Sequence, residues 1–483
     1  MTTEPSRRVP GLPGLVLAAL YLVLVAAPLL LALATGEEPD AAWREAASAL
    51  GLAALAMMAL QFATSGRFEA LSGRIGIDRT MGFHKWAARL LLLALVLHPL
   101  LYAVPAALAD PVRGLAVLER MFTSERLRSG VVAWVAILAL VGLAVLRERV
   151  AFTYEIWRAS HALLAILALV AGIHHAIVSG VYSETAALQT FWIVLAVAAI
   201  GSLAVVYVGR TRLYTRDVWR LVERRRVGTG LWELAFRRES GEAFAYRAGQ
   251  FVWLATAPRR FPLFDHPFSI ASSPRERDLR LVIKEVGDYT RTIPTWEIGL
   301  LAGMDGPHGA FYEEGREASA LVLCAGGVGV APILGVLRDL AARGDRRPVR
   351  VLLAAGRPDK LVGLDEIAGM AERLDLRVLA MVEEAGEGAR EGVAIGRPEP
   401  ARLESLLEGI EPGNALAMIC GPGPFTAAIA DGLLAIGLRQ DAVLYERFDY
   451  AEEGLSRIDR AERLRFRLIG AVAIAAALAF ALR

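Results

Sequence analysis

Five of the seven histidines in the chain lie within two apolar stretches, where a polar ring is unusual. They are His84, His98, His161, His174 and His175. An imidazole surrounded by hydrocarbon is costly unless it is paired, so such a residue commonly binds a cofactor or another polar group. His84 and His98 are 14 residues apart, and His161 and His175 are also 14 residues apart. This repeated spacing indicates two matched pairs of ligands.

A step of 14 residues places two side chains on nearly the same face of an α-helix. It falls roughly 40° short of four turns and raises the second ring by about 21 Å. His174 is 13 residues from His161, and a step of 13 residues falls about 140° short of four turns. The rings of His161 and His174 would therefore project from different faces of the helix. Two facing helices would therefore hold one pair of rings near each side of a hydrocarbon core of about 30 Å. We predict that His84 pairs with His161, and His98 with His175.

Two imidazoles on opposite sides of a haem iron fill both axial positions, which suits electron transfer more than oxygen binding. The spacing therefore predicts two b-type haems, one above the other, held by His84, His98, His161 and His175. Three other roles for these histidines stay open: capping helices, pairing with carboxylates, or forming a proton path through a transporter.

The helices that would carry these rings belong to a strongly apolar part of the chain. Hydrophobic residues make up 55% of the sequence. Six stretches, each close to the roughly 20 residues that a spanning helix needs, precede residue 210. They are 12–34, 43–63, 84–104, 130–146, 160–179 and 188–208. A short stretch at 468–482 is expected to form a seventh span, with a helix lying in the membrane interface as the alternative.

The loops predict an orientation, because short cytoplasmic loops collect lysine and arginine. The loop 65–85 contains three arginines and a lysine, whereas residues 36–40 are acidic. We therefore expect a multi-pass protein of the cytoplasmic (inner) membrane, with everything from residue 211 to the C-terminal stretch in the cytoplasm. The loop 105–128 disagrees, because it is assigned to the far side and contains four arginines.

The sequence after residue 210 is charged and mixed, as in a soluble domain. Apolar runs at 231–236, 251–256 and 279–286, bounded by turn residues, predict strands of a small β-barrel. From about residue 318 the pattern alternates between strand, turn and helix, which is typical of a parallel α/β sheet of the Rossmann type. We expect a haem domain at 1–210, a barrel at 211–315, an α/β domain at 316–450, a linker at 451–465 and a C-terminal helix at 466–483.

Two groups of residues in this half are suited to nucleotide cofactors. His266–Ser269 offer a backbone edge, a hydroxyl and an aromatic face to a flavin, and Lys284, Gly287 and Thr290 offer a cation, close backbone approach and a hydroxyl to a pyrophosphate. A glycine-rich turn at 326–329 follows an apolar strand and opens a helix, which favours phosphate binding at the helix N-terminus. Cys420 ends another strand, where open α/β sheets place their ligands.

Together these motifs resemble the ferric reductase and NADPH oxidase superfamily, in its bacterial form, over nearly the whole chain. The motifs that carry the resemblance are the paired histidines, HPFS (266–269), KEVGDYT (284–290), DGPHG (305–309), GGVGVAP (326–332) and CGPGP (420–424). The resemblance implies FAD contacts at His266, Pro267, Phe268, Ser269, Lys284, Gly287 and Thr290. It implies contacts with the nicotinamide nucleotide at Gly326, Gly327, Gly329, Pro332, Cys420 and Gly421.

Three further residues follow from the resemblance. It implies that Arg357 lies near the adenosine ribose, where a 2′-phosphate would favour NADPH over NADH. Relatives commonly end in a short motif whose aromatic ring covers the flavin, and Phe448 in ERF is the candidate here, although the chain continues for 35 residues. Cys420 is expected close to the nicotinamide.

The expected function is an NAD(P)H-dependent flavocytochrome that passes electrons through FAD and two haems to a ferric chelate or dioxygen outside. No nucleic-acid partner is expected, because the formal net charge is only +2 and no basic tract occurs. Two rival functions are an electron-relay subunit for a separate terminal enzyme and a proton-coupled transporter or sensor with a regulatory nucleotide domain. A relay subunit would need a protein acceptor, and a transporter would carry no haem.

Overall fold

A computed structural model describes residues 11–65, 67–147, 149, 152–239, 244–386, 390–447 and 454–483. The chain divides into two compact units. The helical unit comprises residues 11–209 and 464–483, and the nucleotide unit comprises residues 210–463. Phe448 lies outside the described residues.

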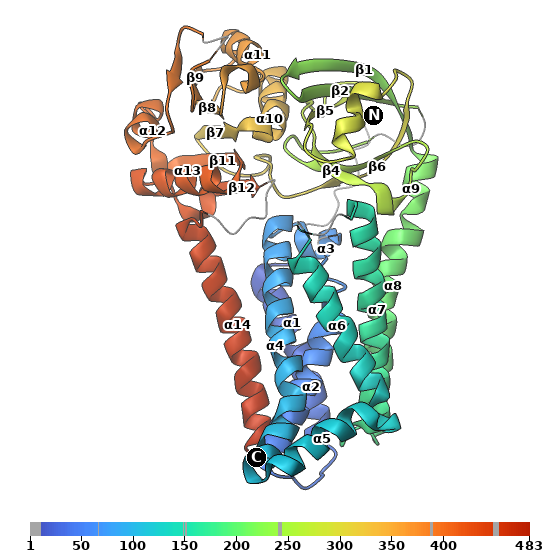
Figure 1. Cartoon of the computed structure of the whole chain (residues 1–483). Helices are drawn as coiled ribbons and strands as arrows, with labels where there is room; N and C mark the ends of the chain where they lie inside the picture. Colours follow the sequence, from blue (N-terminus) through green and yellow to red (C-terminus); the bar gives the residue numbers. More distant parts are fainter. Residues whose placement is uncertain are drawn as a thin grey trace, which may run out of the picture. The chain divides into compact units, whose positions relative to one another are not determined.

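The helical unit is built from long apolar helices, coloured blue to green and red along the chain (Figure 1). They are α1 (Gly14–Leu33), α2 (Ala42–Leu60), α4 (Ile77–Ala109), α6 (Arg128–Val145), α7 (Tyr154–Ser179), α8 (Ala186–Ala204) and α14 (Arg457–Ala481). Shorter helices α3 (Glu69–Ser72) and α5 (Pro111–Thr123) lie in the connections. A π-helical turn at Val205–Gly209 and the short helix α9 (Thr211–Arg216) follow α8.

Six segments of the described chain are helical, long enough and apolar enough to cross a membrane. They are Gly14–Leu33, Ile77–Ala109, Glu125–Val145, Tyr154–Ser179, Ala186–Arg216 and Arg457–Ala481. This confirms a membrane helical bundle, and the C-terminal stretch is among the six. The second expected span, 43–63, forms α2 but is not among them.

Helix α2 differs from the other helices in where its side chains lie. Its first turns carry Arg44 and Glu45, yet nearly all residues from Leu52 to Ala59 are buried. Glu45 is itself buried and accepts hydrogen bonds from the Tyr182 hydroxyl at 2.6 and 2.7 Å. Alanines dominate this helix, so neighbouring helices can approach it closely. Helix α2 is therefore an interior element of the bundle.

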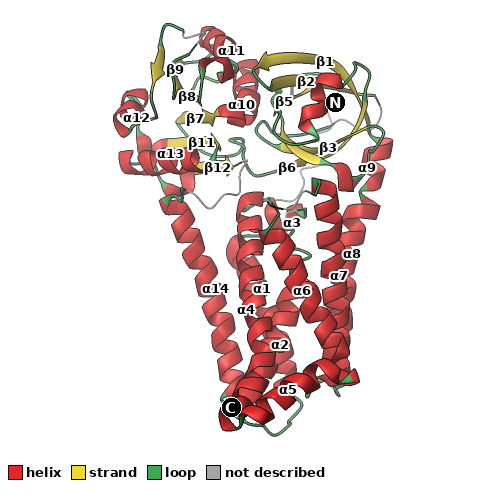
Figure 2. Cartoon of the chain, viewed as in Figure 1, coloured by secondary structure: helices red, strands yellow, loops and turns green. Residues whose placement is uncertain are grey.

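The nucleotide unit begins with an antiparallel barrel whose strands appear in yellow in Figure 2. Its strands are β1 (Val218–Gly228), β2 (Leu231–Arg238), β3 (Phe251–Thr256), β4 (His266–Ser269), β5 (Leu279–Lys284) and β6 (Leu301–His308). They pair in the order β4-β3-β6-β1-β2-β5. A further bridge between Ile270 and Leu281 joins the two outer strands, so the sheet curls toward closure around an apolar core.

A parallel sheet completes this unit. Its strands are β7 (Ala320–Gly326), β8 (Val349–Ala355), β9 (Leu376–Val382), β10 (Val393–Ile395), β11 (Ala415–Gly421) and β12 (Val443–Arg447), in the order β10-β9-β8-β7-β11-β12. Helices α10 (Val330–Arg343) and α11 (Leu364–Gly369) cover one face, and α12 (Pro400–Leu406) and α13 (Gly423–Ile436) cover the other. The expected barrel and α/β sheet are confirmed.

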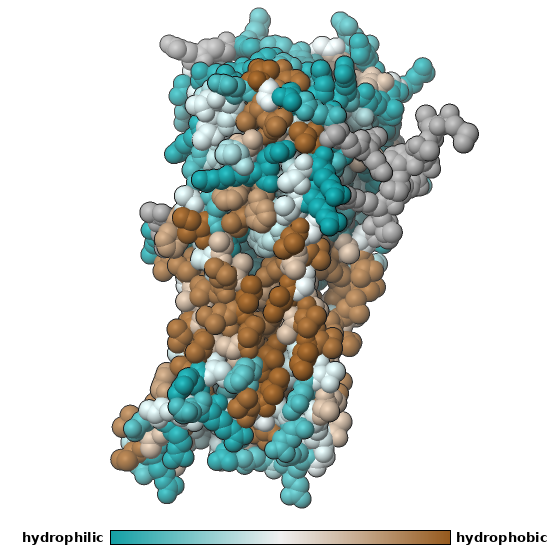
Figure 3. Space-filling model, turned by 90° about the vertical axis from the view of Figure 1, so that its right-hand side faces the viewer, coloured by the Kyte–Doolittle hydropathy of each residue, from teal (hydrophilic) through white to brown (hydrophobic). Residues whose placement is uncertain are grey.

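The surface of the helical unit has the composition that lipid requires. In the face shown in Figure 3, apolar side chains gather over the long helices, whereas hydrophilic side chains cover most of the nucleotide unit. Exposed leucines and valines on α4 recur every three or four residues. They are Leu93, Leu97, Leu100, Val104 and Leu108. Soluble proteins rarely expose a large continuous apolar surface, so this stripe indicates contact with hydrocarbon chains.

Candidate functional site

The first candidate site is a facing pair of histidine rings, which we call the distal pair: His98 on α4 and His175 on α7. Their ring centroids are 6.5 Å apart and the ring planes are nearly perpendicular, at 81°. His98 Nδ1 lies 2.7 Å from the Ala47 carbonyl oxygen, which can only accept a hydrogen bond. The proton of a neutral His98 ring is therefore on Nδ1, and Nε2 is left with its lone pair, as in a metal-binding histidine.

Glycines on neighbouring helices leave room for both distal rings. A methyl group added at Gly51 would lie 3.0 Å from the His98 ring. A methyl group added at Gly130 would lie 2.7 Å from His175 Nδ1. Both distances are shorter than an ordinary van der Waals contact, so any larger residue at Gly130 would have to displace the His175 ring.

The two histidines of the doubled motif have different surroundings. His174 is exposed, and its Nδ1 lies 3.0 Å from the Ser129 hydroxyl. His175 is half-buried, and its Nδ1 has no hydrogen-bond partner among the described residues. The structure thus brings His175, and not His174, against His98, as the 14-residue spacing predicts.

The second pair, His84 and His161, we call the proximal pair. His84 Nδ1 lies 3.2 Å from the Thr64 hydroxyl, and the Gln61 side chain donates to the His84 carbonyl oxygen at 3.1 Å. His161 packs against Trp157, with ring centroids 5.4 Å apart. Its Nδ1 is buried without a hydrogen-bond partner among the described residues. A buried ring nitrogen without a partner is an atom that a bound metal would satisfy.

The two expected flavin motifs meet in the barrel. His266 on β4 stacks against Tyr289 with ring centroids 4.1 Å apart and an angle of 21° between the ring planes. Phe268 is nearly parallel to the same tyrosine at 6.4 Å. Tyr289 of KEVGDYT therefore joins this motif to HPFS, a role that the motif alone did not predict. Pro267 is exposed beside these rings, and Ser269 is buried.

The turn after β5 presents the other expected flavin contacts. The Thr290 hydroxyl accepts hydrogen bonds from the backbone N–H groups of Val286 and Gly287, at 2.9 and 3.1 Å. Gly287 has open space on the side where a side chain would project, and Lys284 is exposed. The turn is therefore ordered by Thr290 and leaves a cation and a bare backbone available to a phosphate.

Two buried carboxylates close to these motifs were missed by the sequence reasoning. Asp265 directly precedes HPFS and accepts a hydrogen bond from the Tyr214 hydroxyl of α9. Asp305 begins DGPHG and forms an ion pair with Arg210 at 2.5 Å. Both aspartates are almost fully buried. Their partners lie at the start of the nucleotide unit, far from them in the chain, so no local pattern pointed to these contacts.

The glycine-rich turns after β7 and β11 are brought together. A methyl group added at Gly421 would lie 3.1 Å from the Gly326 Cα, and one added at Gly329 would lie 2.0 Å from the Cys420 carbonyl oxygen. Gly327 adopts a left-handed φ of +57° and has nothing within 4 Å of its side-chain position. Only glycine permits this close approach, and the open side of Gly327 is a cradle that a side chain would fill. Pro332 is buried in the first turn of α10.

The two cysteines and Arg357 complete the set of predicted residues. The two cysteines form no disulfide and are fully buried, and burial raises the pKa of the Cys324 thiol to about 12. Cys420 ends β11 beside Ala325 of β7, next to the glycine turns. Arg357 follows β8 and is exposed, with its Nε 3.4 Å from an Asp359 carboxylate oxygen.

Three protein families match the chain in sequence. Residues 50–172 match the ferric reductase like transmembrane component, residues 220–297 an FAD-binding domain, and residues 323–431 the oxidoreductase NAD-binding domain. The first match contains His84, His98 and His161, and ends three residues before His175. The second contains HPFS and KEVGDYT, and the third contains both glycine-rich turns.

Curated relatives and solved structures are similar over parts of the chain. Sulfhydrogenase 2 subunit gamma of Pyrococcus furiosus is 32% identical over 41% of this chain and 71% of its own length. Human Dual oxidase 2 is 27% identical over 56% of this chain and 18% of its own length. A flavohemoglobin from Malassezia yamatoensis has a TM-score of 0.45 and 21% identity over 71% of this chain and 85% of its own. The chain spans 41% and 53% of two propane 2-monooxygenase reductase components that it matches.

Proposed function

Because the chain belongs to the ferric reductase and NADPH oxidase superfamily, as a multi-pass membrane NAD(P)H–FAD oxidoreductase, we propose that it conducts electrons across the membrane through two b-type haems. Electrons enter from NAD(P)H by way of FAD and leave to an acceptor on the other side. The observation that carries this proposal is that the ring centroids of His98 and His175 lie 6.5 Å apart.

That separation suits one metal ion between two rings. An imidazole nitrogen binds a transition-metal ion at roughly 2 Å, so two rings on opposite sides of one ion have centroids about 6 Å apart. The Ala47 carbonyl holds the His98 tautomer, and Gly130 leaves the room that the His175 ring occupies. When bound, a bis-imidazole haem supplies a one-electron carrier. We propose His98 and His175 as ligands of one haem, and His84 and His161 as ligands of the other.

In the nucleotide unit we propose that the barrel holds FAD and the parallel sheet holds NAD(P)H. His266, Pro267, Phe268, Ser269, Lys284, Gly287 and Thr290 contact FAD, and Gly326, Gly327, Gly329, Pro332, Cys420, Gly421 and Arg357 contact the nicotinamide nucleotide. The stacked His266, Tyr289 and Phe268 rings supply an aromatic wall, and the turn at Gly327 supplies bare backbone for a pyrophosphate. FAD, when bound, links a two-electron donor to one-electron acceptors.

The proposed domains are a haem domain at 1–210, an FAD domain at 211–315 and an NAD(P) domain at 316–450, followed by a linker and the C-terminal helix. We place the protein in the cytoplasmic membrane with both nucleotide sites in the cytoplasm, because the loop 65–85 is rich in arginine and lysine. The acceptor on the far side is a ferric chelate or dioxygen.

A second candidate role is an electron relay for a separate terminal enzyme. It is favoured by the names of relatives that are similar to part of the chain, which include the reductase component of propane 2-monooxygenase and the electron transfer component of a halobenzoate dioxygenase. A relay would reduce no small acceptor by itself and would regain turnover when its protein partner is added.

The test is anaerobic reduction of the purified full-length protein by NADPH and by NADH, followed by addition of ferric citrate or oxygen. We expect about two haems per chain, both reduced by the nucleotide, and a loss of about one haem in His98→Ala and in His161→Ala. His174→Ala is the matched control and should keep both haems, since its ring contacts Ser129. Full haem content with an unchanged spectrum in His98→Ala would overturn the proposal.

A further inference from the structure

One face of α10 is attached to the chain segment that continues from the flavin strand β4. Gly335, Arg338 and Asp339 share this face, because they are three and four residues apart. A methyl group added at Gly335 would lie 2.6 Å from the Ile270 carbonyl oxygen, so the helix meets the strand backbone directly. The Ser273 hydroxyl donates to Asp339 at 2.8 Å. The helix that follows the glycine-rich turn is thus fixed to the segment that follows HPFS.

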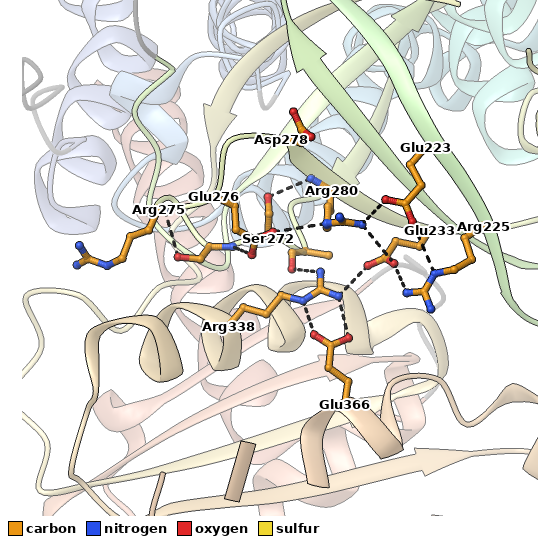
Figure 4. Close-up of polar contacts among 12 residues, drawn as sticks. Glu223, Arg225, Glu233, Ser272, Arg275, Glu276, Asp278, Arg280, Arg338 and Glu366 are labelled. Carbon is orange, nitrogen blue, oxygen red and sulfur yellow. Dashed lines mark hydrogen bonds and ion pairs between the residues drawn. The ribbon is translucent and has the colours of Figure 1, made fainter. Parts of the chain in front are cut away.

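Arg338 is the centre of this attachment (Figure 4). Its Nη1 donates to the Ala271 carbonyl oxygen at 2.8 Å, and its Nη2 donates to Glu233 of β2 at 2.8 Å. Its Nε and Nη2 donate to the two carboxylate oxygens of Glu366 on α11, at 2.6 and 2.9 Å. All three nitrogens of the guanidinium are engaged, and the side chain is 11% exposed. One arginine therefore joins α10 and α11 to strand β2 and to the segment that follows β4.

Glu233 is held from the barrel side as well. Its side chain is 3% exposed, and its second oxygen lies 2.5 Å from Arg225 and 3.7 Å from Arg280. A buried carboxylate with this many cationic partners is held in a single position, since moving it would leave a charge unpaired in a poorly solvated place. Because the Glu233 carboxylate is held in place, a shift of α10 would break its hydrogen bond with Arg338.

We propose that Arg338 is a positioning residue for hydride transfer, because it holds the nicotinamide-binding turn at a set distance from the flavin-binding strand. The inference rests on the proposed assignment of NAD(P)H to the turn at 326–329 and of FAD to β4. Hydride transfer moves two electrons and one proton together from the dihydronicotinamide to the flavin. The dihydronicotinamide becomes oxidised and the flavin becomes reduced. Arg338 touches neither reacting group, so its effect passes through α10.

Hydride transfer is sensitive to such positioning. A displacement of about 1 Å between reacting groups can cost about 100-fold in rate even when the cause lies far from the chemistry. Lysine can replace the arginine only in part, because the three donors of an ammonium group cannot make the four hydrogen bonds that the guanidinium makes to Ala271, Glu233 and Glu366. A loss of this attachment should therefore slow the transfer step more than it weakens either cofactor's binding.

The experiment uses the full-length protein with its FAD and five variants: Arg338→Gln, Arg338→Lys, Glu233→Gln, the double variant of Arg338→Gln with Glu233→Gln, and the control Arg377→Gln. Arg377 forms an exposed ion pair on β9, away from the barrel. Flavin bleaching is followed by anaerobic stopped flow with NADPH and NADH, and nucleotide affinity is measured separately with NADP⁺ and NAD⁺. The absorbance of the nicotinamide–flavin charge-transfer complex and the flavin content are recorded for each variant.

We expect Arg338→Gln to lower the rate constant for flavin bleaching at saturating nucleotide by roughly 10- to 100-fold. Flavin content and nucleotide affinity of Arg338→Gln should stay within about threefold of those of the unchanged protein, and its charge-transfer absorbance should be weaker. The bleaching rate of Arg338→Lys should lie between those of Arg338→Gln and the unchanged protein. Adding Glu233→Gln to Arg338→Gln should cost little more, because the two residues act as one unit. Arg377→Gln should match the unchanged protein in every measurement.

The proposal is overturned if Arg338→Gln bleaches its flavin at the normal rate, or if the rate falls only in proportion to lost flavin. If Arg338→Gln does not fold, Arg338→Lys decides: a normal bleaching rate with normal charge-transfer absorbance overturns the proposal equally. The readout involves flavin and nucleotide only. Failure of the haem proposal, which would appear as full haem content with an unchanged spectrum in His98→Ala, is therefore distinguishable from failure of this inference.

Discussion

At the scale of single residues, two glycines determine how much room the distal histidine rings have. Gly51 faces His98, and Gly130 on α6 faces His175 Nδ1 at a distance that allows no methyl group. In membrane helices glycine often allows another helix to pack closely. Here each glycine instead leaves space for an imidazole ring. The positions of these glycines are as informative about the distal pair as the histidines themselves.

Replacing Gly130 with alanine should therefore disturb the distal pair. The added methyl group would lie 2.7 Å from His175 Nδ1 and must displace the ring, so we expect haem content to fall from about two to about one per chain. Gly142→Ala on the same helix is the matched control, because nothing lies within 4 Å of its side-chain position. The measurement is haem per protein by a haemochrome assay. Two haems with unchanged reduction potentials in Gly130→Ala would contradict the expectation.

At the scale of elements, α5 explains the loop whose charge disagreed with the predicted orientation. Asp110 caps this helix by accepting a hydrogen bond from the Val112 N–H at 2.9 Å, and Pro111 occupies its first turn. Gly114 packs against Ala107 of α4, so the helix folds back onto the bundle. A face formed by Leu115, Leu118 and Phe122 stays exposed. We therefore expect this amphipathic helix to lie in a membrane interface, with its arginines toward the headgroups.

Spin labels can test this placement of α5. Labels on cysteines at Leu115 and Phe122 should be more accessible to oxygen, which dissolves in lipid, than to a water-soluble nickel complex. Labels at Arg113 and Arg120 are the controls and should show the reverse order, because these residues lie on the opposite face. The two native cysteines are buried, so background labelling should be low. Equal nickel accessibility at all four positions would place α5 in water.

At the scale of the whole molecule, the barrel and the parallel sheet form one compact unit that is held together partly by charge. Although burial acts in the opposite direction, hydrogen bonding to Arg225 and the charge of Arg338 hold the pKa of Glu233 below its ordinary value. A carboxylate with a depressed folded-state pKa contributes stability above its unfolded pKa of about 4.3 and loses it as pH falls through the folded pKa.

The free energy of unfolding of the nucleotide unit at acidic pH should therefore depend on Glu233. We expect Glu233→Gln to lower the free energy of unfolding of the nucleotide unit at pH 7 by about 2 to 4 kcal/mol, because it removes a buried carboxylate that both Arg338 and Arg225 pair with. The same variant should lose less stability than the normal protein between about pH 5 and pH 3. Flavin release during denaturant titration measures both effects. Glu239→Gln, which removes an exposed pair with Arg220, is the control and should leave both quantities unchanged.

Much of this architecture could be predicted from local patterns. Apolar length identified the membrane helices, apolar runs bounded by turn residues identified β2, β3 and β5, and the glycine-rich turn at 326–329 identified the start of α10. The interior position of α2 could not be read in this way, because its composition is intermediate and only its neighbours determine which side chains are buried. The roles of Phe448 and Arg357 stay predictions.

The sequence by itself determined the classes of element and the spacing of the histidines, because both depend on residues close together in the chain. The tertiary structure alone decided that Tyr289 stacks on His266, that Ala47 holds the His98 ring and that Arg338 joins the nucleotide sheet to the barrel. Each of these contacts joins residues from different elements. Their partners depend on how whole helices and strands pack, and no local pattern encodes that.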